Sequence, residues 1–159
     1  VIAGAPGTDE QTYRQVLTQS TSSQRTSIVY GETYPLLTHS YGAMVTSGTA
    51  TLETALFRVP QVVCYYTMCG KIVNFFRRII LKVKHISLVN LVADRSVVPE
   101  LVADKMCEQE LREALKQILT DESFRNHMLE EYDLTVISPL GEPGASQHAA
   151  EKMVQLLKG

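Results

Sequence analysis

A short apolar strand that runs through a turn of small residues into a helix is the feature that most constrains the fold of this chain. The strand is Ala43–Thr46, the turn spans residues 47–49, and Glu53 follows one turn into the predicted helix. Such a turn leaves backbone N–H groups free where the helix dipole favours negative charge. The Glu53 carboxylate can accept hydrogen bonds from two vicinal hydroxyls, as an acidic residue does for the ribose in dinucleotide folds. The pattern therefore favours an α/β fold with a nucleotide site at this turn.

The same residues also have an ordinary structural interpretation. Thr49 is a good N-cap residue, and Glu53 is a favourable charge in the first turn of a helix. Small-residue turns before helices occur throughout α/β proteins. Local chemistry alone leaves both the ligand site and the plain helix cap open.

Strand-like and helix-like segments alternate over residues 1–98. This order predicts a Rossmann-like parallel sheet with helices on both faces. The expected strands are 1–5, 27–30, 43–46 and 61–66, and the expected helices are 9–17, 34–39, one that begins at Thr49, and a basic helix. Ligands of open α/β sheets bind beyond the carboxyl ends of the strands, where the turns at 31–33 and 47–51 fall.

Residues 99–159 are predicted to form helices without strands, over 106–119, 123–134 and 145–157, and Glu100 is expected to start a helix. Their apolar residues keep helical spacing in two stripes: Leu111, Leu115, Ile118 and Leu119, then Ala149, Met153, Leu156 and Leu157. We expect the last helix either to dock on its own domain or to exchange between two chains in a homodimer.

Length and composition fit a single domain over residues 1–159. A chain of 159 residues that is 45% hydrophobic can bury one sizeable core. The sequence has neither an apolar run long enough to cross a bilayer nor a signal-peptide pattern at its start. Its cysteines, Cys64, Cys69 and Cys107, lack metal-ligand spacing, so a reducing compartment, the cytoplasm, is expected.

Positive charge is concentrated in one part of the chain. Residues 54–93 contain six Lys or Arg and no Asp or Glu, although the whole chain has a formal net charge of −2. Helical spacing within 70–82 places Lys71, Arg78 and Lys82 opposite an apolar face. Such a helix can lie on an anionic membrane, pack on the sheet with a solvated basic face, or meet a diphosphate through Arg77, Arg78 or Lys82. A local patch, a pI near 6.1 and no recognition motif argue against nucleic acid.

Several kinds of chemistry lack their sequence patterns. The four histidines have no metal-ligand spacing, no serine lies in Gly-x-Ser-x-Gly, and no glycine-rich loop ends in Gly-Lys-Ser/Thr. An acidic cluster beside the predicted phosphate site is also lacking. The sequence gives no reason to expect a metal, a cofactor, a hydrolase triad or a P-loop.

Four segments, in the same order, resemble the lipid-A-disaccharide synthase family. They are the run 43–63 with Ser-Gly-Thr-Ala-Thr-Leu-Glu, residues 85–95 with Asn90 at the centre, residues 98–102, and residues 140–146. Each segment alone is a weak signal, but the set is specific and covers essentially the whole chain.

The resemblance implies the C-terminal domain of a two-domain GT-B glycosyltransferase, ending in an all-helical segment. Such an enzyme transfers diacylglucosamine, with inversion, from UDP-diacylglucosamine to a lipid monosaccharide phosphate and forms the lipid A disaccharide. This chain is then expected to be the UDP-binding half. The acceptor site and the catalytic carboxylate are expected in an N-terminal domain, so no catalytic residue and no activity are expected in this chain alone. A Gram-negative source and a peripheral position at the inner membrane are also implied.

The resemblance assigns roles to particular residues. Those expected to hold the phosphates of UDP are Ser47, Gly48, Thr49 and Thr51. Glu53 is expected to hold the ribose, and Asn90 either to contact the donor or to fix its own loop. The residues expected to meet a membrane or the diphosphate are Lys71, Arg77, Arg78 and Lys82. The alternatives are another UDP-sugar GT-B enzyme, such as an epimerase or a peptidoglycan-type transferase, or a non-enzymatic α/β domain that binds a membrane or a partner helix.

Overall fold

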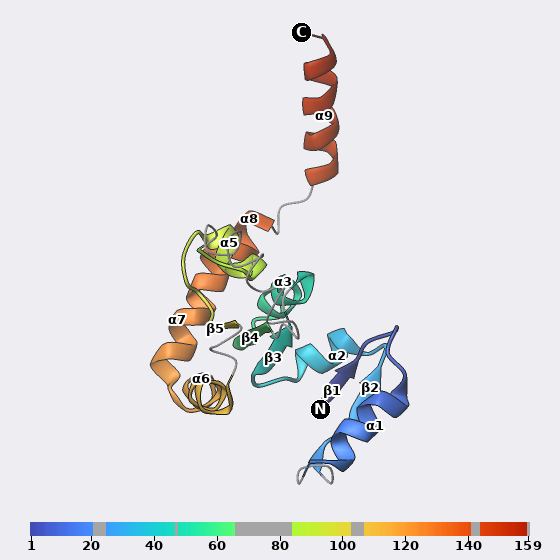
Figure 1. Cartoon of the computed structure of the whole chain (residues 1–159). Helices are drawn as coiled ribbons and strands as arrows, with labels where there is room; N and C mark the ends of the chain where they lie inside the picture. The colour runs from blue at the N-terminus through green and yellow to red at the C-terminus, as the bar shows by residue number, and fades with distance from the viewer. Residues whose placement is uncertain (21–24, 47, 66–83, 103–106, 141–143, 159) are drawn as a thin grey trace, which may run out of the picture. The chain divides into compact units, whose positions relative to one another are not determined.

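The structure is a computed structural model, and it describes residues 1–20, 25–46, 48–65, 84–102, 107–140 and 144–158 (Figure 1). Ser47 and the basic residues Lys71, Arg77, Arg78 and Lys82 lie outside the described residues. The chain divides into two compact units, Val1–Ser40 and Tyr41–Gly159, and each is described by itself. The prediction that residues 1–159 form one domain stays a prediction.

The first unit is a βαβ arrangement followed by a short helix. Strands β1 (Ile2–Gly4) and β2 (Ile28–Tyr30) pair in parallel. Between them lies α1 (Glu10–Thr18), and α2 (Thr33–Thr38) follows β2. The side chain of Asp9 caps α1 by accepting a hydrogen bond from the N–H of Gln11 at 3.2 Å. Parallel strands need such a crossover, because a tight turn can join only antiparallel strands.

The second unit is built on a three-stranded parallel sheet in the order β3-β4-β5 (Figure 1). Its strands are β3 (Ala43–Thr46), β4 (Gln61–Tyr65) and β5 (Glu100–Val102). The first four residues of β4 are all buried, so both faces of this central strand are covered, as is usual for a parallel sheet. Two helices, α3 (Thr49–Leu56) and α6 (Glu108–Thr120), contact β4.

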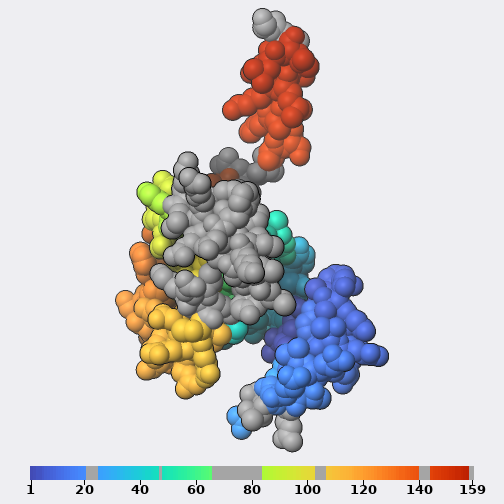
Figure 2. Space-filling model, viewed as in Figure 1, coloured from blue at the N-terminus to red at the C-terminus, as the bar shows by residue number. Residues whose placement is uncertain are grey.

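Further helices of the second unit follow β4 in the chain. α5 (Leu88–Ala93) precedes β5 and packs on α3. α7 (Glu122–Tyr132) runs directly into the π-helix η3 (Asp133–Ile137) and then into α8 (Ser138–Leu140). The π-helix contacts both α3 and α5. α9 (Ala145–Lys158) is the last helix, and its side chains from Ala145 to Leu157 are exposed (Figure 2).

The core of the second unit joins the sheet to α5, α6, α7 and η3. Its fully buried members include Val62, Val89, Ile118, Tyr132 and Val136. The hydroxyl of Tyr132 accepts a hydrogen bond from Gln61 Nε2 at 3.2 Å and donates to the Val59 carbonyl at 3.4 Å. Burial raises the pKa of Tyr132 well above that of a free tyrosine. The polar contacts inside this core therefore connect β4 to α7.

The structure confirms the predicted α/β fold with parallel strands and a helical end. The prediction for the segment after Pro99 is wrong at its start, because Glu100–Val102 form β5 beside β4. Glu100 therefore lies in a strand and does not start a helix. A strand of three residues is too short to show alternation in the sequence.

Candidate functional site

The turn between β3 and α3 presents an open helix N-terminus. Gly48 is the N-cap residue, with φ 128° and ψ −163°, a backbone conformation that side chains disfavour. Within the part of the chain that the structure describes, no side chain caps the first N–H groups of α3. A Cβ added to Gly48 would meet no atom of a described residue within 4 Å. The helix end therefore has space for a negatively charged group.

Thr49 and Glu53 place two polar side chains on this helix. Gly48, not Thr49, is the N-cap residue, so the simple interpretation of Thr49 as an ordinary cap is wrong. The side chain of Thr49 is exposed and that of Glu53 is half-buried. Neither side chain bonds to any residue that the structure describes. Both are therefore available to a ligand near the N-terminus of α3.

Thr51 is part of the turn itself. Its side chain is fully buried, and its hydroxyl donates to the Gly48 carbonyl at 2.8 Å. The backbone N–H of Thr51 donates to the same carbonyl at 3.2 Å. The hydroxyl that was expected to hold a phosphate thus holds the shape of the turn.

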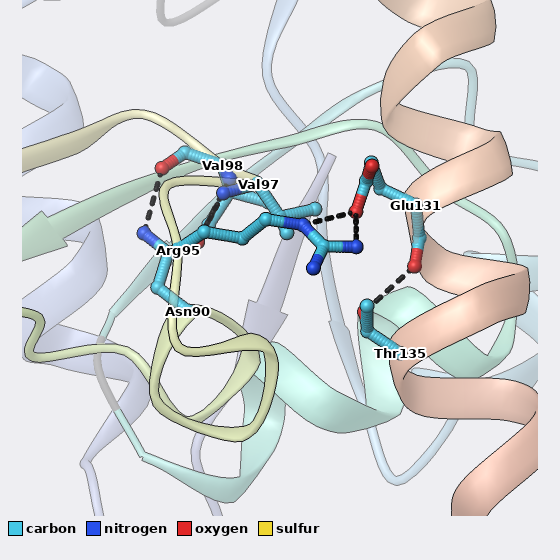
Figure 3. A network of polar contacts seen from close by, with 6 residues as sticks. All are labelled: Asn90, Arg95, Val97, Val98, Glu131 and Thr135. Carbon is cyan, nitrogen blue, oxygen red and sulfur yellow. Dashed lines mark hydrogen bonds and ion pairs between the residues drawn. The ribbon is translucent and has the colours of Figure 1, made fainter.

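Asn90 in α5 is fully buried and uses its whole hydrogen-bonding capacity within the protein. Its Nδ2 donates to the Val98 carbonyl at 2.9 Å and to Glu100 Oε1 at 2.8 Å. Its Oδ1 accepts the N–H groups of Val97 at 2.8 Å and Val98 at 2.9 Å (Figure 3). A flipped amide would turn its donor toward donors, so these partners fix its orientation. The contacts match the second role expected of Asn90, which is to fix its own loop.

Glu100 binds the two residues that lead into α5. It accepts hydrogen bonds from the N–H of Ile86 at 3.1 Å and from the N–H and hydroxyl of Ser87 at 2.8 and 2.6 Å. Ser87 is the N-cap residue of α5. Sequence reasoning missed this role, because the partners lie 13 and 14 residues before Glu100 and no local pattern joins them. Described side chains thus cap the start of α5, whereas no described side chain caps the start of α3.

The other described surfaces add nothing to the predicted site. One hollow of about 450 Å³ lies beside β5 and α6, and another of about 410 Å³ lies within the first unit. None of the predicted site residues lines either hollow. The described residues hold no cluster of His, Cys, Asp or Glu that could bind a metal. Among the helices that the structure describes, none is long and apolar enough to cross a membrane.

Comparison with known proteins identifies the family. The family model described as lipid-A-disaccharide synthetase matches residues 5–152. The lipid-A-disaccharide synthase of Myxococcus xanthus is 36% identical over 82% of this chain and 33% of its own length. The one from Prochlorococcus marinus is 40% identical over 73% of this chain and 29% of its own length. The chain thus spans about a third of the length of these relatives, and it belongs to the lipid-A-disaccharide synthase family.

Proposed function

We propose that this chain is the UDP-binding part of a lipid-A-disaccharide synthase. The whole enzyme would transfer diacylglucosamine from UDP-diacylglucosamine to a lipid monosaccharide phosphate. The observation that carries the proposal is the N-terminus of α3, which no described side chain caps, with the Glu53 carboxylate, which bonds to no described residue, one turn further along the helix. Membership of the family supports it, since the relatives are named for the synthesis of this disaccharide.

The proposed site divides the donor between backbone and side chains. The N–H groups at the start of α3, together with the hydroxyls of Thr49 and Ser47, would hold the diphosphate. Groups that are already oriented toward the phosphates would stabilise the charge that develops on departing UDP. Glu53 would accept hydrogen bonds from the two ribose hydroxyls. Thr51 and Asn90 would support this site indirectly, because each fixes its own backbone segment through hydrogen bonds.

The acceptor and the catalytic base are proposed to belong to another part of the enzyme. The chain covers about a third of the length of its relatives, and the α3 turn would supply groups for the leaving UDP. Inversion at the sugar carbon also needs a base on the acceptor hydroxyl. We therefore propose that transferase activity requires a partner domain.

The same enzyme would work at a membrane, because both of its proposed substrates carry acyl chains. We propose a cytoplasmic protein that lies peripherally on the inner membrane. Lys71, Arg77, Arg78 and Lys82 would contact anionic lipid, at about 1 kcal/mol for each basic residue near the surface. This part of the proposal rests on the sequence and on the family, since these residues lie outside the described ranges.

Titration with UDP, followed by backbone amide NMR, tests the proposed donor site. We expect saturable shifts from Gly48 to Glu53, and an affinity about tenfold lower for Glu53→Ala, which loses two charge-assisted hydrogen bonds. Uridine, which has no phosphate, should bind more weakly than UDP to every variant.

The matched control is Glu113→Gln, because Glu113 is an exposed glutamate on α6 with no bond to a described residue. Glu53→Gln should lose affinity and Glu113→Gln should not. Equal affinity of wild type and Glu53→Ala for UDP would contradict the assignment of the ribose contact. That result would favour the non-enzymatic α/β domain, which predicts that Glu53 is replaceable.

A further inference from the structure

Helix α3 ends in a left-handed residue that is not glycine. Arg58 has φ 56°, its N–H donates to the Ala55 carbonyl at 2.9 Å, and the N–H of Val59 donates to the Thr54 carbonyl at 3.1 Å. These two bonds form a Schellman motif, in which glycine is the usual residue at the left-handed position. Arginine there is conformationally disfavoured.

Helix α5 ends in the same motif. Asp94 has φ 50°, its N–H donates to the Leu91 carbonyl at 3.3 Å, and the N–H of Arg95 donates to the Asn90 carbonyl at 3.3 Å. Arg58 and Asp94 are the two residues other than glycine with positive φ in the described ranges. Both helices that contact each other beside the sheet therefore stop at a disfavoured backbone position.

An arginine at each of these helix ends pairs with the same short stretch of α7 and η3. Arg58 forms an ion pair with Asp133. Arg95 donates from Nε at 2.8 Å and from Nη2 at 2.5 Å to Glu131 Oε2, which Figure 3 shows. The Glu131 carbonyl accepts the Thr135 hydroxyl at 2.6 Å where the α-helix gives way to the π-helix. Two carboxylates two residues apart thus hold the ends of both α3 and α5.

Stability alone does not account for arginine at position 58. The side chains of Arg58 and Asp133 are 49% and 45% exposed, and ion pairs this exposed contribute little to folding. Glycine would close the same Schellman motif without the penalty of a left-handed β-carbon. A non-glycine residue found in this backbone conformation, with a side chain that contacts another element, points to a role beyond local stability.

We propose that Arg58 is a positioning residue for the donor site, and that its pair with Asp133 fixes the direction of α3. This inference rests on the proposed function. α3 has eight residues and is about 12 Å long. A tilt of about 5° at the Arg58 end therefore moves the N-terminus by about 1 Å, enough to misplace a bound diphosphate. Arg95 and Glu131 hold the neighbouring α5 in the same way.

Two glycine variants separate positioning from stability. Arg58→Gly and Asp94→Gly each relieve a left-handed residue, but only Arg58→Gly removes an ion pair that the structure shows. We expect the thermal midpoint of both variants to equal or exceed that of the wild type. We expect the affinity for UDP to fall about three- to tenfold in Arg58→Gly and to stay unchanged in Asp94→Gly.

Asp133→Asn removes the same pair from the other side and leaves the backbone of Arg58 untouched. It should weaken UDP binding as much as Arg58→Gly does, and the double variant should bind no worse than either single one. If Arg58→Gly and Asp133→Asn bind UDP as the wild type does, the positioning role is overturned.

A second readout without UDP keeps this test independent of the proposed function. Residual dipolar couplings of the α3 N–H groups should show a tilt of the helix in Arg58→Gly and Asp133→Asn, but not in Asp94→Gly. If the wild type does not bind UDP, the proposed function is wrong, and the dipolar couplings alone then test whether the ion pair fixes the direction of α3. Unchanged couplings in Arg58→Gly and Asp133→Asn would overturn the inference, whatever UDP does.

Discussion

At the scale of single residues, Asn90 is the side chain on which the loop before β5 most depends. It is fully buried and bonds to three backbone groups and to the Glu100 carboxylate. If the amide were removed, each of these four groups would lose a hydrogen bond. Buried polar groups without partners reduce the free energy of unfolding, so the main role of this amide is structural.

Replacing Asn90 by aspartate should destabilise the chain by about 3 kcal/mol or more. In Asn90→Asp a carboxylate oxygen would face the Val98 carbonyl and Glu100, which now accept from Nδ2. Burial disfavours the charged form of an aspartate at position 90, so the loss should shrink as the pH falls and this aspartate takes up a proton. Urea unfolding at two pH values measures both effects.

The matched control is Asn126→Asp, because Asn126 is exposed on α7. It makes the same chemical change on a solvated surface and should cost no more than about 0.5 kcal/mol. Equal stability of Asn90→Asp and Asn126→Asp would contradict the four contacts assigned to Asn90.

At the scale of helices and strands, the junction of β4, α3 and α7 depends on one buried tyrosine. Gln61 Nε2 donates to the Thr51 carbonyl at 2.9 Å and to the Tyr132 hydroxyl at 3.2 Å. Gln61 Oε1 has no partner among the described residues. The tyrosine hydroxyl therefore completes a polar bridge between three elements in an otherwise apolar core.

Tyr132→Phe should lower the free energy of unfolding by about 1 kcal/mol, because the Val59 carbonyl and Gln61 lose a partner. Burial raises the folded-state pKa of Tyr132 above 10.0, the pKa of an ordinary tyrosine. The protonated folded form is then favoured, so the tyrosine's contribution is full below pH 10.0 and falls as the pH rises further. The free energy of unfolding, measured at pH 8 and above pH 10, should fall between these pH values in the wild type and fall less in Tyr132→Phe. An equal fall in both proteins would contradict the assignment.

Patterns along the chain predict elements well where they are long or regular. The predicted bounds of strands β3 and β4 and of helices α6 and α9 lie within about two residues of the observed bounds. β5 was missed because its pairing with β4, not its own three residues, makes it a strand. The π-helix was missed because its geometry depends on Thr135 bonding back to Glu131 and on packing against α3 and α5.

The candidate site was predictable only in part, for a related reason. Gly48 and Glu53 lie within one short stretch, so strand, turn and helix order was enough to single them out. The roles of Arg58 and Glu100 depend on partners 75 and 13 residues away in the chain. Contacts of that kind leave no periodic signal, and only the folded backbone brings them together.

At the scale of the whole molecule, the last helix has an apolar stripe without a described partner. Met153, Leu156 and Leu157 are 66%, 83% and 86% exposed. Exposed apolar stripes of this kind mark interaction surfaces more often than solvated ones. The sequence predicts either docking on the chain's own domain or exchange between two chains, and exchange would make the chain a dimer.

Replacing the stripe should abolish self-association and leave the core intact. Leu156→Ser with Leu157→Ser removes both leucines of α9, whereas Lys152→Ser alters an exposed polar position of the same helix. Light scattering after size-exclusion chromatography should show a dimer for the wild type and for Lys152→Ser, and a monomer for the leucine variant.

The thermal midpoint extrapolated to low protein concentration should be the same for all three, because α9 contributes no residue to the described core. A wild type that is monomeric at high concentration would contradict the exchange. A monomer whose thermal midpoint falls in the leucine variant would instead indicate that α9 docks on its own domain.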